Sequence, residues 1–226
     1  MYRAVLRKSV KVRGVSEGRH ISRVSPDWVW ISDWNNLILT NTAGDELHCL
    51  SDIGSYHGVH TVNNEGDLFY IDSGHNINQL STDNTVRNIF IKYTAPWRPL
   101  CVYSSPSTGD LLVGMRNTDT RTGKVNRYNN KGLQIQTINN NIIGQGLYSL
   151  PIYITENHNG DVIVSNWDCV VVTDREGRFR FSYTGPPLGP GLWPRGLSTD
   201  ALSHILVCDH RTDSVQIIDK DGQFLS

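Results

Sequence analysis

The sequence predicts an all-β fold, a β-propeller of four-stranded blades, and its composition, repeats and turns each point there. The 226 residues include only 4 Ala, 5 Glu and 2 Met, which favour helix interiors, against 19 Asn, 19 Ser, 20 Gly and 9 Pro, which favour turns. Charged residues make up 19%, too few for a solvated coiled coil, whereas 38% hydrophobic residues suit a folded, soluble chain. The composition therefore excludes a helical bundle.

A repeat of about 43 residues supplies the second observation. Short apolar strands that end in a small or polar residue recur at 29–33, 68–72, 111–115, 162–166 and 205–209, and a Gly-Asp turn precedes three of them. A hairpin turn follows each strand, with Asn, Ser or Asp first and Gly or Asn fourth, at 41–44, 81–84, 129–132, 174–177 and 219–222. Four antiparallel strands in each period of about 40 residues form one blade of a propeller.

The blades follow one another through a single domain that spans 1–226. We expect them at about 17–55, 56–95, 96–147, 148–190 and 191–226. Residues 1–16 have no apolar strand and turn of their own, so they are predicted to be the outer strand of the closing blade. The chain stops inside the last strand of its fifth unit. This favours an incomplete six-bladed ring, although five blades with an extra edge strand fit as well.

One face of this propeller is predicted to bind a ligand. Loops between the second and third strands of a blade share a face with the connections between blades. Arg, Trp and Tyr, which are typical of interface hot spots and of platforms that stack RNA bases, gather in these segments. Trp97 and Trp193 could instead wedge neighbouring blades apart. The predicted binding residues are Trp34, Trp97, Arg98, Arg116, Arg121, Tyr148, Trp167, Trp193, Arg195 and Arg211.

The repeats resemble NHL repeats, in which an apolar strand ends in Asp and a Gly hairpin follows. Residues 209–224 fit best and 33–39 fit well, while the third unit departs most, with Met115 in place of Asp. The chain as a whole resembles the C-terminal NHL propeller of tripartite-motif (TRIM) proteins, which are ubiquitin ligases. Their RING and B-box modules are absent, so any ligase activity would belong to missing upstream modules. The resemblance implies recognition of a substrate protein or of RNA.

Few residues suggest catalysis. Asp33, Asp72, Asn166 and Asp209 recur in register, and we interpret them as acceptors for backbone N–H groups rather than as metal ligands. The eight His and four Cys residues have no metal-ligand spacing, and Cys101 and Cys208 are expected in buried strands. We therefore expect no catalytic residue, no metal and no cofactor. Reduced thiols and the lack of an apolar leader suggest the cytoplasm.

Three functions remain in order of preference. The first is a non-catalytic module, not an enzyme, that recognises a protein substrate or scaffold partner through the loop face, as in TRIM-NHL ubiquitin ligases. The alternative is binding of single-stranded RNA through the same face, against which the net charge of −1 counts. The third is a hydrolase or lyase of propeller fold. A protein partner is expected, with RNA second, and no DNA, membrane or small-molecule cofactor.

Overall fold

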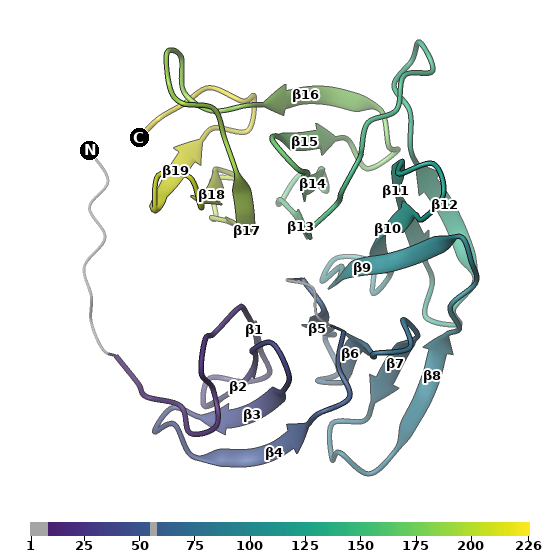
Figure 1. Ribbon diagram of the computed structural model, residues 1–226, viewed down its shortest axis with the longest axis vertical. Helices are drawn as coiled ribbons and strands as arrows, with labels where there is room; N and C mark the ends of the chain where they lie inside the picture. The colour runs from purple at the N-terminus through teal and green to yellow at the C-terminus, as the bar shows by residue number, and fades with distance from the viewer. Residues whose placement is uncertain (1–8, 55–57) are drawn as a thin grey trace.

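Five antiparallel sheets are arranged around a common axis in the computed structural model, which describes residues 9–54 and 58–226 (Figure 1). Four sheets have four strands and the last has three. The first strand of each sheet lies nearest the axis, and the chain moves outward through each sheet before it starts the next one. The prediction of an all-β propeller is confirmed, and the described residues form no helix.

The sheets follow the chain in order, so each is one blade. Blade 1 contains β1 (His20–Arg23), β2 (Trp28–Ser32), β3 (Leu37–Asn41) and β4 (Glu46–Leu50). Blade 2 contains β5 (His60–Val62), β6 (Leu68–Ile71), β7 (Ile77–Leu80) and β8 (Arg87–Ile91). Blade 3 contains β9 (Trp97–Ser104), β10 (Leu111–Asn117), β11 (Gly123–Tyr128) and β12 (Gln134–Ile138). Blade 4 contains β13 (Tyr153–Glu156), β14 (Val162–Ser165), β15 (Val170–Thr173) and β16 (Phe179–Tyr183), and blade 5 contains β17 (Pro194–Thr199), β18 (Ile205–Asp209) and β19 (Ser214–Ile218).

Turn residues fix the outer hairpin of each blade. The fourth turn residue has a positive φ in every blade, for example 92° at Gly44 and 61° at Asn84, which takes the place of Gly in blade 2. Asn tolerates this left-handed backbone better than most residues. The first turn residue closes the hairpin from its side chain, because Asn41 Oδ1 accepts hydrogen bonds from the N–H groups of Ala43 and Asp45.

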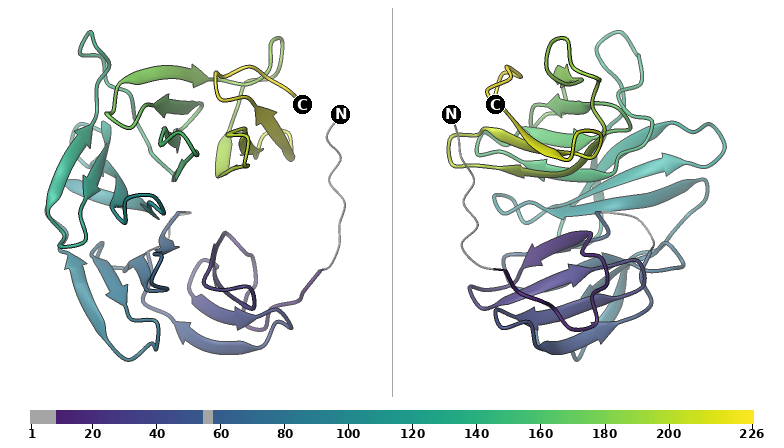
Figure 2. Two further views of the ribbon diagram at one scale, coloured as in Figure 1. Left: turned by 180° about the vertical axis from the view of Figure 1, so that it is seen from behind. Right: turned by 60° about the vertical axis from the view of Figure 1, so that its left-hand side comes forward.

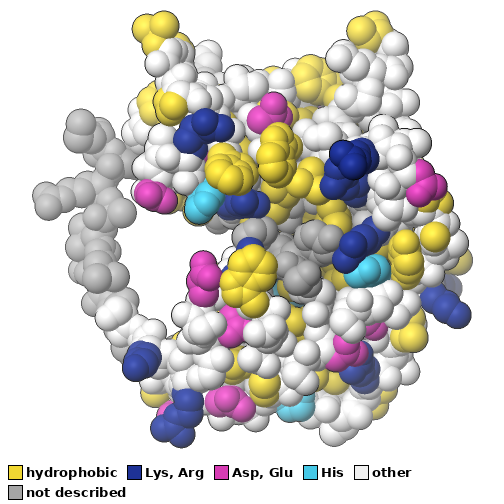
Figure 3. Space-filling model, viewed as in Figure 1, with side chains coloured by type: hydrophobic (Ala, Val, Ile, Leu, Met, Phe, Trp, Pro, Cys, Tyr) yellow, Lys and Arg dark blue, Asp and Glu magenta, His cyan; other side chains and the backbone are white. Residues whose placement is uncertain are grey.

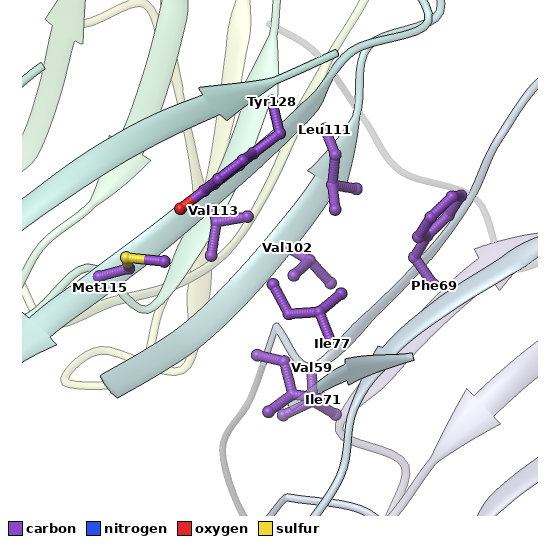
Figure 4. Close-up of a cluster of buried hydrophobic side chains, with 9 residues drawn as sticks. All are labelled: Val59, Phe69, Ile71, Ile77, Val102, Leu111, Val113, Met115 and Tyr128. Atoms are coloured by element: carbon purple, nitrogen blue, oxygen red, sulfur yellow. The ribbon is translucent and has the colours of Figure 1, made fainter. Parts of the chain in front are cut away.

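The core lies between neighbouring blades. Figure 4 shows one such layer, where Val59, Ile71 and Ile77 of blade 2 face Val102 and other side chains of blade 3. A blade buries its two faces only by packing on a neighbour, which explains why the units occur in series. The same rule explains one wrong prediction. Cys101 is buried between blades, but Cys208 in β18 is exposed, because its side of blade 5 faces no other blade.

Blades 1 and 5 occupy the two ends of an open arc (Figures 1 and 2). The predicted N-terminal outer strand falls partly on residues 1–8, which lie outside the described residues, and 9–16 form no strand. Instead, the Arg13 N–H donates to the Gly44 carbonyl in blade 1. At the other end, the Leu225 N–H donates to Ile217 O, so the last residues lie alongside β19. Within the described residues, no helix is long and apolar enough to cross a membrane.

Candidate active site

Polar side chains at the end of the second strand shape the loop face. At Asp33, Asp72 and Asp209 the carboxylate oxygen accepts N–H groups of the loop that follows, as predicted. The prediction is wrong for Asn166, whose Oδ1 accepts from the connection before its blade, and in blade 3 Asn117 has this role instead. Asp33 Oδ1 accepts from Asn35 and Asn36 at 2.8 Å each, and Asp72 Oδ1 accepts from Asn76 at 2.8 Å. These carboxylates are buried and have several partners, so they serve the fold.

The same side chains also hold the connection that leads into their blade, a role that the sequence did not suggest. Asn166 Oδ1 accepts from the Leu150 N–H at 2.8 Å, and Asp209 Oδ1 accepts from the Trp193 N–H at 3.0 Å. Both connections are thereby fixed beside the loops between second and third strands. The two classes of loop therefore share one face, as expected. Hydrogen bonds fix the backbone that carries the side chains of this face.

A cavity of about 420 Å³ opens on this face between blades 3 and 4. Three arginines line it, namely Arg98 in β9, Arg116 in β10 and Arg121 in the loop after β10, together with Leu100 and Leu150. Arg116 pairs directly with Arg98 across the two strands. Arg121 reaches the cavity from a left-handed backbone with φ of 60°. The sequence predicted all three arginines for one binding surface, and the structure brings them together.

His75 lies in the loop between β6 and β7 and is near enough to Arg98, which lines this cavity, for the charge of Arg98 to act on its ring. Its backbone is left-handed, with φ of 68°, which is unusual for a side chain of this size and often marks a functional position. The ring lies edge-on to Tyr93 at 5.5 Å between centroids, and its Nδ1 is buried without a hydrogen-bond partner among the described residues. Burial and then the charge of Arg98 lower the pKa of His75, and Asp72 opposes them. The imidazole is therefore neutral at pH 7.

His75 was not predicted as a functional residue. The histidines were considered only as metal ligands, and a metal-ligand spacing cannot single out one histidine in a loop. A signal was nevertheless present, because His75 is the third residue after Asp72, inside an Asx-stabilised turn that forces an unusual backbone. Leu100 and Leu150 were missed because they come from different blades.

A second cluster of predicted residues lies in blades 4 and 5. The rings of Trp167 and Trp193 are 6.0 Å apart, and His210 meets Trp193 at 4.9 Å. The Arg195 guanidinium lies 5.1 Å from the Trp193 ring centre. Trp167 and Trp193 border, with Arg211, a smaller cavity of about 100 Å³. Figure 3 shows basic, histidine and hydrophobic side chains around the centre of one face.

The remaining predicted residues lie apart from both cavities. Trp34 is 48% exposed, with the Arg19 guanidinium 3.1 Å above its ring, and its Nε1–H donates to Glu17. Trp97 packs against the core between blades 2 and 3, which fits the wedge interpretation. Tyr148 is only 4% exposed and belongs to the core between blades 3 and 4. Tyr148 is therefore a core residue, because the hydrophobic ring is covered by its own connection.

The hub of the propeller contains a cavity of about 360 Å³ that is lined by the first strands of all five blades. His20 in β1 and His60 in β5 meet there edge to face, with ring centroids 4.5 Å apart. The Tyr153 hydroxyl donates to the Arg19 carbonyl at 2.6 Å. Burial lowers the pKa of His20 to about 4 and that of His60 well below its usual value. Both rings are therefore neutral at pH 7.

The described residues do not fit a metal site. In 9–54 and 58–226, no three side chains of His, Cys, Asp or Glu gather closely enough to hold an ion. Calcium needs six or more oxygen ligands, usually from several carboxylates. We therefore derive no step through a metal.

No protein-family model and no curated protein match the chain, but solved structures match its fold. A streptogramin B lyase aligns with a TM-score of 0.70 at 14% identity, over 93% of this chain and 68% of that one. The calcium-binding protein regucalcin from Agrobacterium tumefaciens aligns with a TM-score of 0.67 at 15% identity, over 94% and 74%. A gluconolactonase from Xanthomonas campestris gives a TM-score of 0.66 at 14% identity, over 93% and 75%.

These structures correct two predictions from the sequence. The predictions of a non-catalytic module that recognises a protein partner, and of a chain that is not an enzyme, are wrong, because the neighbours in fold include lyases and gluconolactonases. The propeller part of the resemblance is confirmed, and its TRIM-like part is not supported. At these levels of identity the likeness itself shows the fold, so the chemistry must be argued from the residues.

Proposed function

We propose that this chain is a hydrolase or lyase of propeller fold whose active site is the arginine-lined cavity together with His75. The observation that carries the proposal is His75 itself. Its ring is neutral at pH 7, its Nδ1 is buried without a described partner, and its backbone is left-handed. A neutral imidazole can accept a proton, as general base catalysis requires.

Both reaction classes begin with the same proton transfer. In a hydrolysis, His75 would take a proton from the attacking water, and in an elimination it would take one from carbon next to a carbonyl group. Negative charge then develops on the carbonyl oxygen. Arg98 and Arg116 carry guanidinium groups on the adjacent strands and would stabilise this charge. The NHL-like repeat pattern is compatible with this function. The repeated residues form the turns of each blade, whereas other residues line the cavity.

A substrate screen with a matched pair of variants tests the proposal. The purified chain is assayed against lactones and esters for hydrolysis and against substrates with an acidic C–H for elimination, with and without added divalent cations. In His75→Asn, Asn tolerates the left-handed backbone but cannot act as base, so we expect kcat/KM to fall by about 10²- to 10⁴-fold.

The control is His158→Asn, which changes an exposed histidine in the turn between β13 and β14, on the opposite face. It should leave kcat/KM unchanged. Turnover that survives in His75→Asn, or turnover that His158→Asn abolishes equally, would place the chemistry elsewhere. Circular dichroism and a melting curve of each variant show whether the fold is intact.

A further inference from the structure

We infer that the arginine-lined cavity is a subsite for a carboxylate, so that the substrate is a small organic acid with an apolar part next to its carboxylate. That the bound acid is a substrate rests on the proposed function, whereas binding of a carboxylate in this cavity does not require turnover. Among the residues that the structure describes, three positive groups and no acidic side chain line the cavity.

Two of the three arginines in this cavity, Arg116 and Arg121, form no ion pair with the described residues. Two other arginines with little exposure face carboxylates: Arg127 contacts Glu156 at 2.6 Å, and Arg180 contacts Asp221 at 2.9 Å. Like charges directly opposite each other on paired strands destabilise a sheet. An anion from solution would remove this cost.

One donor in the cavity also needs an acceptor. The Nε of Arg116 is buried and has no hydrogen-bond partner among the described residues. Buried polar groups nearly always have a partner, so such a group points to a ligand or to water. The forked guanidinium matches a carboxylate through two parallel hydrogen bonds, and a second arginine across the strand pair can bind the same group from its other side.

The remaining side chains of the cavity indicate that the part of the ligand away from its carboxylate is apolar. Leu100 and Leu150 form an apolar wall, and the Asn166 side chain fixes the backbone of Leu150. A volume of about 420 Å³ is at the small end of the range for ligand pockets. A short branched carboxylic acid therefore fits both the charge and the apolar wall.

Calorimetric titration with 3-methylbutanoate tests the subsite at about 0.15 M ionic strength, where weak surface effects are screened. The neutral amide of the same acid and inorganic phosphate are titrated in parallel. We expect the carboxylate to bind at least about tenfold more tightly than the amide and more tightly than phosphate. Arg116→Gln should weaken carboxylate binding by about tenfold or more.

Arg13→Gln is the matched control, because it removes the same charge from an exposed position in the segment that leads into blade 1, outside the cavity. It should leave the affinity unchanged. Equal binding of acid and amide, an unaltered affinity in Arg116→Gln, or tighter binding of phosphate would overturn the inference. Binding without turnover of any substrate would contradict the proposed function alone. Turnover of neutral substrates without carboxylate binding would contradict the subsite alone.

Discussion

The buried His60 side chain at the hub makes the stability of the protein depend on pH. It is 0% exposed and its ring meets that of His20 edge to face, so protonation of either ring would place a charge in the buried hub. Because the pKa values of both groups are lower in the folded chain than in the unfolded chain, the unfolded state binds more protons between these values. Their contribution to stability is complete above the unfolded pKa of about 6.5 and is lost as the pH falls toward 4.

This pH dependence is a prediction for the free energy of unfolding. Between about pH 6.5 and about pH 4.5 we expect a loss on the order of 4 kcal/mol from the histidine pair, about half of it from each ring. The loss is measured by urea unfolding at several pH values. In His60→Phe the ring is kept and the titration removed, so the slope with pH should become shallower whatever the variant's stability at pH 7. An identical slope would show that the hub histidines do not titrate in this window.

Blades are held together by short polar contacts at the ends of their second strands. Asp209 is 2% exposed and accepts from the Trp193 and Arg211 N–H groups through Oδ1 and from Thr212 and Gln216 through Oδ2. The same position is held by Asn117 in blade 3, two residues beyond the Met115 that the sequence repeat aligns there, and by Asn166 in blade 4, which shows that an uncharged acceptor can serve. What matters at this scale is the oxygen that fixes the connection, rather than the charge.

We therefore expect Asp209→Ala and Asp209→Asn to lower the free energy of unfolding by different amounts. Asp209→Ala leaves several buried donors without a partner and should lower the free energy of unfolding by about 2–3 kcal/mol. Asp209→Asn keeps the Oδ1 acceptor and should lower it by less than half as much. Both values come from urea unfolding at pH 7. Equal losses would mean that the charge of Asp209, and not its hydrogen bonds to the connection, stabilises blade 5.

At the scale of the whole molecule, the repeating features could be predicted and the site only in part. Gly44 and Asn84 occupy turns that every blade repeats, so their positions follow from local sequence. Arg98 and Arg116 were assigned to one face because the strand order fixes the face. The role of His75 could not be predicted in this way, since its neighbour Arg98 belongs to the next blade. Function was predicted wrongly for the same reason: the repeats describe a blade, whereas the cavity depends on contacts between blades.

The most direct test of the account is an NMR titration of the His75 ring between about pH 4 and about pH 8, alone and with 3-methylbutanoate, assigned with His75→Asn. If the base and the carboxylate subsite form one active site, the pKa of His75 is below 6.5 in the free protein and rises when the carboxylate binds, because a nearby negative charge favours the imidazolium. A pKa at or above 6.5, or one that does not respond to bound carboxylate, would contradict the account.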